Sequence, residues 1–168
     1  RILARDVVAP IYLPPFANSA MDGFAVRHGD LLDGQALRLV GEQFAGRALG
    51  LRIEAGECVR ITTGAPMPEG ANTVVIREDA TVEGNRMHVT AQIRSGANVR
   101  RAGEDVIAGE RVLDAGIRLT PAHVGVIAAL GIAQLDVARR PTVAVFTTGD
   151  ELVEPGLPLE PGQIYNSN

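Results

Sequence analysis

The sequence predicts a mainly β chain with several domains, in which a compact β barrel or sandwich precedes one helix. Short runs rich in β-branched and aromatic residues recur between residues 23 and 93, separated by Gly, Asp, Asn and Pro. No helical period lies between these runs, and the first strong helix-capping signal is at Thr120. Close spacing of short strands without intervening helices favours a barrel or a sandwich.

The composition supports a globular chain and excludes some classes of function. The chain has 168 residues, 46% of them hydrophobic, which is enough for a core. Its net charge of -4 gives no electrostatic reason to expect nucleic acid or an anionic membrane as a partner. All 16 basic residues are Arg, which excludes a Schiff-base lysine and a P-loop lysine.

Without a membrane-length apolar run or a leader-like start, we expect a soluble, cytoplasmic protein. The single cysteine, Cys58, fits a reducing compartment and is interpreted as a core thiol. Both chain ends, Arg1 and Asn168, have the character of cuts in a longer sequence.

The expected strands of the β domain cover residues 24–27, 36–40, 57–62, 73–77 and 87–93. Residues 1–13 suit either the end of a helix or an extended entry segment. Glycines after Asp105 indicate two further short strands joined by turns.

A shaped loop, N-S-A-M-D-G-F-A-V from Asn18, follows the pair Pro14-Pro15. Asp22 precedes Gly23, a residue tolerant of positive φ, so the Asp22 carboxylate has a defined direction. Such a carboxylate can orient a cation or accept a proton. The alternative is an Asp that only hydrogen-bonds its own turn.

Two more polar segments have both a functional and a structural interpretation. The loop T-T-G-A-P-M-P from Thr62 is stiff and exposes N–H groups that can hold an oxyanion, or it is an ordinary wide turn. Arg100 and Arg101 precede Glu104 and Asp105 closely. These four residues form either surface ion pairs or a second polar site.

The clearest helix begins at Thr120, a good N-cap, with Pro121 at the first helical position and Gly131 after its end. His123 lies in its first turn and is interpreted as a surface or packing residue. We find no metal-binding spacing of His or Cys in the sequence.

After the linker at residues 139–141, the run T-V-A-V-F-T at 142–147 predicts a buried strand. Thr148, Gly149, Asp150 and Glu151 follow at its carboxyl end, which is where ligands bind in open α/β sheets. One strand and one loop do not establish such a sheet.

These segments together resemble the molybdopterin molybdenumtransferase family, of the bacterial MoeA type and the E domain of gephyrin. The resemblance rests on six motifs in the same order, which span nearly the whole chain: P-P-F-A-N-S-A-M-D-G-F-A-V from Pro14, R-I-T-T-G-A-P-M-P-E-G-A from Arg60, V-V-I-R-E from Val74, R-R-A-G-E-D-V from Arg100, T-T-G-D-E-L from Thr147 and G-Q-I-Y-N-S-N from Gly162.

The resemblance implies an internal fragment of a longer protein with three parts. The β domain at 17–100 would be inserted in a small, elongated mixed α/β domain formed by 1–16 and 101–140. Residues 141–168 would be the truncated start of a molybdopterin-binding α/β domain.

The resemblance also implies an enzyme that inserts molybdate into adenylylated molybdopterin with Mg²⁺ and releases AMP. Its partners would be a second copy, in a homodimer, and the molybdopterin adenylyltransferase that supplies the substrate. Catalytic roles map onto Asp22, Thr63, Asp105 and Glu151, with Asp22 and Glu151 as metal ligands. The cofactor pocket would include the following residues: Ser19, Thr148, Gly149, Asp150 and Ser167. Asn166 departs from the family pattern, which commonly has an acid there.

In the family, the β domain of one subunit faces the α/β domain of the other, so Asp22 and Thr63 would meet Glu151 only across a dimer. The resemblance therefore implies that these 168 residues alone are inactive. Two alternatives stay open: a gephyrin-like scaffold or binding module, and a homologue that inserts tungstate.

The adjacent acids Glu78 and Asp79 are interpreted as solvated.

Overall fold

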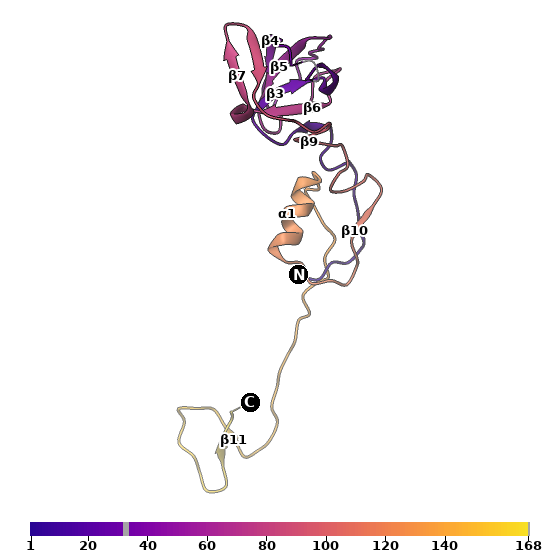
Figure 1. Ribbon diagram of the computed structural model, residues 1–168. Coiled ribbons are helices and arrows are strands. Elements are labelled where there is room, and N and C mark those ends of the chain that lie inside the picture. Colours follow the sequence, from indigo (N-terminus) through magenta and orange to yellow (C-terminus); the bar gives the residue numbers. More distant parts are fainter. Residues whose placement is uncertain (32–33, 168) are drawn as a thin grey trace. The chain divides into compact units, whose positions relative to one another are not determined.

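The computed structural model describes residues 1–31 and 34–167, so Asn168, the last residue of the sixth motif, lies outside the described residues. The chain divides into two compact units, Arg1–Val137 and Ala138–Asn168. The first unit holds nearly all of the regular structure, and each unit is described by itself (Figure 1).

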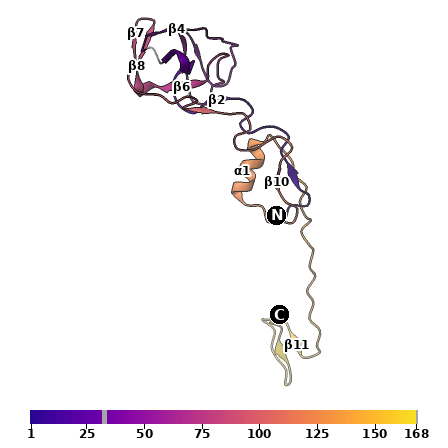
Figure 2. The same cartoon turned by 45° about the vertical axis from the view of Figure 1, so that its right-hand side comes forward.

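A curled six-stranded sheet is the main element of the first unit (Figures 1 and 2). Its order is β6-β3-β5-β4-β8-β7, and every pair is antiparallel except β4 with β5. The strands are β3 (Gly23–Val26), β4 (Leu37–Gln43), β5 (Glu57–Ile61), β6 (Thr73–Ile76), β7 (Ala80–Glu83) and β8 (Arg86–Val89). Short 3-10 helices at His28–Leu31 and Arg77–Asp79 follow β3 and β6.

Alternating side chains divide the core between the two faces of this sheet. One cluster contains Phe24, Val26, Leu37, Cys58, Val75 and Met87. The other contains Ala25, Ile61, Ala65 and Val74. Burial of both faces explains why the central strands have continuous apolar runs, and it confirms the prediction that Cys58 is a core thiol, since its exposed fraction is 0%.

The five strands predicted in the β domain are present, with ends that differ by a few residues. Strand β7 was not predicted. It is one of the two edge strands of the sheet, and its residues are exposed or half-buried, so its sequence has no strong apolar alternation.

Residues 1–13 are extended, which decides between the two interpretations of that segment. Strand β1 (Val7–Val8) pairs with β10 (Arg111–Leu113), and isolated bridges join Leu3 to Val137 and Leu13 to Val106. Of the two strands expected after Asp105, only β10 forms as a strand. The segment around Val106 and strand β10 do not pair with each other. Each of them pairs instead with the N-terminal segment, Val106 with Leu13 and β10 with β1. Strand β2 (Asn18–Ser19) pairs with β9 (Val99–Arg100).

The predicted helix is confirmed as α1 (Pro121–Ala129). Thr120 Oγ1 accepts from the N–H of His123 at 3.4 Å, and the Thr120 N–H donates to His123 Nδ1 at 3.2 Å. His123 is therefore part of the helix cap. Gly131 follows the end of the helix with a φ of 74°. Among the described residues, no helix is long and apolar enough to cross a bilayer.

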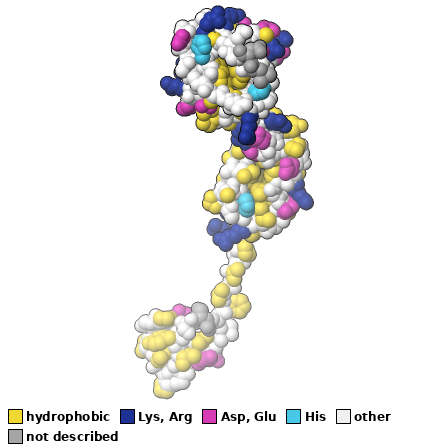
Figure 3. Space-filling model, viewed as in Figure 1, with side chains coloured by type: hydrophobic (Ala, Val, Ile, Leu, Met, Phe, Trp, Pro, Cys, Tyr) yellow, Lys and Arg dark blue, Asp and Glu magenta, His cyan; other side chains and the backbone are white. Residues whose placement is uncertain are grey.

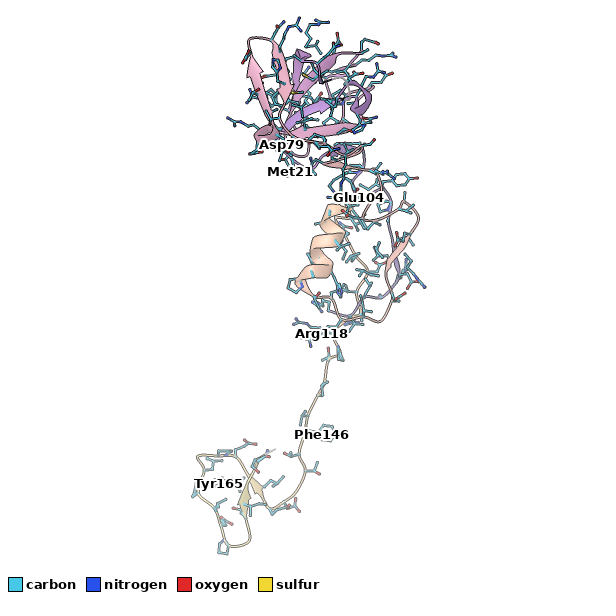
Figure 4. All side chains as sticks on the ribbon, viewed as in Figure 1. Met21, Asp79, Glu104, Arg118, Phe146 and Tyr165 are labelled. Carbon is cyan, nitrogen blue, oxygen red and sulfur yellow. The ribbon has the colours of Figure 1, made fainter. Side chains whose placement is uncertain are left out.

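The second unit contains two short parallel strands, β11 (Leu152–Val153) and β12 (Ile164–Tyr165). The prediction of a buried strand at 142–147 is wrong for the described chain, because no described segment pairs with these residues. Their hydrophobic side chains are exposed, with Val143 at 75%, Val145 at 78% and Phe146 at 84%. Figure 4 labels Phe146 on this segment, and Figure 3 shows hydrophobic side chains along it. A β-branched run forms a strand only when a neighbouring strand completes its hydrogen bonds.

Candidate functional site

Asp22 and Thr63 meet because of the strand register. Gly23, at the start of β3, lies opposite Ile61 at the end of β5 and Ile76 at the end of β6. Residues that precede β3 and follow β5 or β6 therefore gather at one end of the sheet. Met21 and Asp79 are seen at this end in Figure 4.

Thr63 holds one oxygen of the Asp22 carboxylate with two hydrogen bonds. The Thr63 N–H donates to Asp22 Oδ1 at 2.7 Å, and the Thr63 hydroxyl donates to the same oxygen at 2.8 Å. The Asp22 carbonyl also accepts from the Arg77 N–H at 3.1 Å. The interpretation that Asp22 merely bonds its own turn is wrong, because its side-chain partner lies 41 residues away.

The same contacts decide the electrostatics of Asp22. The Thr63 N–H, and then the Thr63 hydroxyl, lower the pKa of Asp22 below its ordinary value. Burial opposes these two hydrogen bonds with a smaller effect, and the positive charges of Arg77 and Arg60 lower the pKa with effects that are smaller still. Asp22 is therefore an anion at neutral pH, and both Thr63 donors are directed at it rather than at an external oxyanion.

Gly23 is needed here because another backbone lies close to it. A Cβ at position 23 would lie 2.0 Å from the carbonyl oxygen of Val75 in the paired strand β6. Gly23 is not among the glycines with positive φ, so the expected role in a left-handed turn is wrong. Its missing side chain lets β6 pair beside Asp22.

Ser19, predicted to line the cofactor pocket, is buried, with an exposed fraction of 1%. Its hydroxyl donates to the carbonyl of Met21 at 2.6 Å, and its backbone exchanges hydrogen bonds with Gly64 and Ala65. In this conformation Ser19 fixes the loop that carries Asp22 against the loop that carries Thr63. Its binding role stays a prediction.

Asp105 lies in a separate cluster of the first unit. Arg100 Nη2 donates to Asp105 Oδ1 at 2.5 Å, and Arg100 Nε donates to Glu104 at 3.2 Å. The pKa of Glu104 is lowered, first by the hydrogen bond from the Arg101 N–H and then by Arg100. The cluster is an exposed ion-pair network, and Arg100 connects it to β2 because β9 pairs with that strand.

The other predicted residues lie in the second unit and are exposed: Thr148 is followed by Gly149, Asp150 and Glu151, and Ser167 lies near the described end. The Glu151 carboxylate folds back over Gly149, where an added Cβ would lie 2.5 Å from Oε2. Asn166 donates to Thr147 Oγ1 at 2.8 Å and so ties the two motifs of this unit together.

A Mg²⁺ ion was expected at Asp22 and Glu151. No cluster of three or more His, Cys, Asp or Glu side chains that could hold a metal occurs in the described part of the chain. Mg²⁺ is commonly bound by one or two carboxylates together with substrate phosphates and water, rather than by an all-protein cage. An ionised Asp22 fits one protein ligand of such a site.

Two arginines at this end of the sheet were not predicted. Arg60 lies in the second motif and Arg77 in the third, and both charges act on Asp22. The only available signal was that each stands at or just after the end of a strand. Isolated arginines in sequence are usually solvated, so this position alone was a weak signal.

Comparisons with known proteins agree with the motif pattern. Residues 1–131 match the family described as "MoeA N-terminal region (domain I and II)". A molybdopterin molybdenumtransferase of Haemophilus influenzae is 43% identical over 169 residues, covering 100% of this chain and 42% of the relative. Molybdopterin molybdenumtransferase 2 of Mycobacterium tuberculosis is 47% identical over 173 residues, covering 99% and 42%.

A solved structure, the molybdopterin biosynthesis MoeA protein of Pyrococcus horikoshii, is also similar. It superposes with a TM-score of 0.86 at 34% identity and covers 99% of this chain and 44% of that protein. The chain thus spans less than half the length of the relatives that it matches.

Proposed function

The chain belongs to the family described as the MoeA N-terminal region (domain I and II), and from this premise we propose that the protein carrying it is a molybdopterin molybdenumtransferase. It acts in molybdenum cofactor biosynthesis, in the cytoplasm. The enzyme inserts molybdate into adenylylated molybdopterin and releases AMP. The observation that carries this proposal is the identity of 43% and 47% to named transferases along the whole chain.

Asp22 is the central side chain of the proposed site. Its carboxylate is ionised at neutral pH and aimed by two donors of Thr63, so it can serve as one ligand of a Mg²⁺ ion. The bound Mg²⁺ would supply positive charge to the phosphate and molybdate oxygens of the substrates. Thr63 acts through Asp22 and is a positioning residue.

Glu151 supplies the second carboxylate in the proposal. Thr148, Gly149, Asp150 and Ser167 line the pocket for molybdopterin in the proposal, and all four residues are exposed and so open to a ligand. Asp105 acts through its ion pair with Arg100, which keeps the β2–β9 ladder beneath the Asp22 loop in place.

The enzyme works as a homodimer, with Asp22 and Thr63 of one subunit and Glu151 of the other in one site. It receives its substrate from a molybdopterin adenylyltransferase. Neither nucleic acid nor a membrane is a partner, in keeping with the net charge of -4.

The activity test uses the full-length protein with molybdopterin adenylate, Mg²⁺ and either molybdate or tungstate. AMP release and pterin-bound metal are measured by chromatography and mass spectrometry. We expect metal-dependent insertion of molybdate in preference to tungstate. Asp22→Asn and Glu151→Gln should each lower the rate by roughly 10- to 100-fold or more. Glu83→Gln, on the edge strand β7, is the matched control and should retain the rate.

A complementation test addresses the dimer. When Asp22→Asn and Glu151→Gln subunits are co-expressed, each mixed dimer should contain one site with both substitutions and one intact site. Part of the activity should therefore return, although each variant alone has a strongly reduced rate. If mixed dimers form and stay inactive, the proposed sharing of the site between subunits is wrong.

A further inference from the structure

A cleft of about 360 Å³ opens beside Asp22 in the curled sheet. Its apolar walls are formed by Phe24, Leu39, Ile61, Ala80 and Val82. Phe24 belongs to the core cluster of this face, and Leu39 and Ala80 pack against that cluster. The cleft is therefore an extension of the core that side chains do not fill.

Two guanidinium groups line the polar side of the cleft. Arg60 lies opposite Phe24 in the β3–β5 register, so both side chains project from the same face of the sheet. Arg77 follows β6 at the same end, is exposed, and makes no ion pair with any residue that the structure describes.

The charges of the cleft favour an anion on the arginine side. Arg60 is within 3.4 Å of Glu42, but both side chains are about half exposed, and such surface pairs are weak. Asp22 is the only acid among the lining residues, so its charge offsets that of one of the two arginines. The arginines therefore leave an excess of positive charge beside an apolar wall.

We propose that this cleft binds a planar aromatic group that carries an anionic substituent, with the ring against Phe24 and Val82 and the anion at Arg60 and Arg77. Apolar walls hold the ring through burial, and guanidinium groups donate charge-assisted hydrogen bonds to an oxyanion. The inference concerns binding alone and does not depend on the proposed transfer of molybdenum.

The probes are 1-anilinonaphthalene-8-sulfonate and its uncharged analogue N-phenyl-1-naphthylamine, which differ in the sulfonate. Each is titrated into the full-length protein and followed by fluorescence, with calorimetry for stoichiometry. We expect saturable binding of the sulfonate at one site per chain. The double variant Arg60→Gln/Arg77→Gln should weaken its binding roughly tenfold or more. Binding of the uncharged analogue should stay within twofold.

Two control variants, Arg86→Gln and Thr81→Asp, separate loss of binding in the cleft from general effects of substitution. Arg86→Gln also removes one arginine from the sheet but does not line the cleft, and it should leave both affinities unchanged. Val82→Asp should weaken both probes. Thr81→Asp, on the opposite face of the same strand, should weaken neither.

Equal binding of the sulfonate by the double variant and the natural protein would overturn the proposal. So would equal effects of Val82→Asp and Thr81→Asp, since these would place the probe elsewhere. Because no molybdate or molybdopterin is present, failure of this test is distinct from failure of the transfer assay.

Discussion

Thr63 donates its backbone N–H and its hydroxyl to a single oxygen of Asp22, over 2.7 and 2.8 Å. The two residues lie on loops that leave adjacent strands at the same end of the sheet. This pair connects the loop before β3 to the loop after β5. It keeps the carboxylate ionised and pointed in one direction.

Thr63→Val should raise the pKa of Asp22 toward its ordinary value. The substitution removes the hydroxyl donor but keeps the branched shape and the N–H, so the pKa should stay below that of a free Asp. Carboxyl carbon NMR titration measures it. If Asp22 binds the metal, the insertion rate should fall roughly 10- to 100-fold. Thr63→Ser should keep both properties, and an unchanged pKa in Thr63→Val would contradict the assigned role of the hydroxyl.

Acidification should remove the stabilisation that Asp6 provides between β1 and β10. The Ala115 N–H donates to Asp6 Oδ1 at 2.7 Å, and this bond, followed by that of Arg111, lowers the pKa of Asp6. A carboxyl whose native pKa is lowered stabilises the fold above its unfolded pKa of about 3.9, and the effect is lost as the pH falls through the native pKa.

Asp6→Asn should therefore lower the melting temperature at pH 7 by a few degrees at most, and less at pH 3. Differential scanning calorimetry across this range measures the difference. Glu83→Gln, whose side chain has no hydrogen bond or ion pair with other described residues, is the control. If the loss of melting temperature in Asp6→Asn grows toward acid pH, this assignment of Asp6 is contradicted.

Gly23→Ala should destabilise the β domain strongly. The added methyl group would lie 2.0 Å from the Val75 carbonyl oxygen and 3.0 Å from the Ile76 Cα, and backbone atoms in a paired strand have little freedom to move. Overpacking of this kind costs about 1–3 kcal/mol or more. Denaturant unfolding measures the loss. Gly29→Ala, where an added Cβ meets nothing within 4 Å, should cost far less; equal losses would disprove the packing argument.

Cys58 should be unreactive in the native protein. Burial, and then the nearby charge of Glu57, raise the pKa of the Cys58 thiol to about 12. Because the native pKa is raised, the fold favours the protonated thiol. This contribution to the stability of the fold is complete below the unfolded thiol pKa and is lost as the pH rises from that pKa through the native one. A disulfide reagent at pH 8 should label the chain only after unfolding in guanidinium. Rapid labelling of the native protein would show that the core around β5 opens.

Local sequence signals predicted much of the fold. Thr120, Pro121 and Gly131 predicted both ends of α1, because capping and left-handed end positions depend on a few neighbouring residues. The β domain was recognisable because its strands contain β-branched runs separated by turn residues. Asp22 and Thr63 were each identified within their motifs, but their contact was not.

The tertiary structure decided what depends on residues distant in sequence. The pairing of β3 with β5 and β6 brought Asp22 to Thr63 and placed Arg60 and Arg77 beside them, and no local pattern contains that register. The run at 142–147 shows the converse. Its composition favours a strand, yet it pairs with no described segment, because strand formation needs hydrogen bonds from a neighbour that local sequence does not specify.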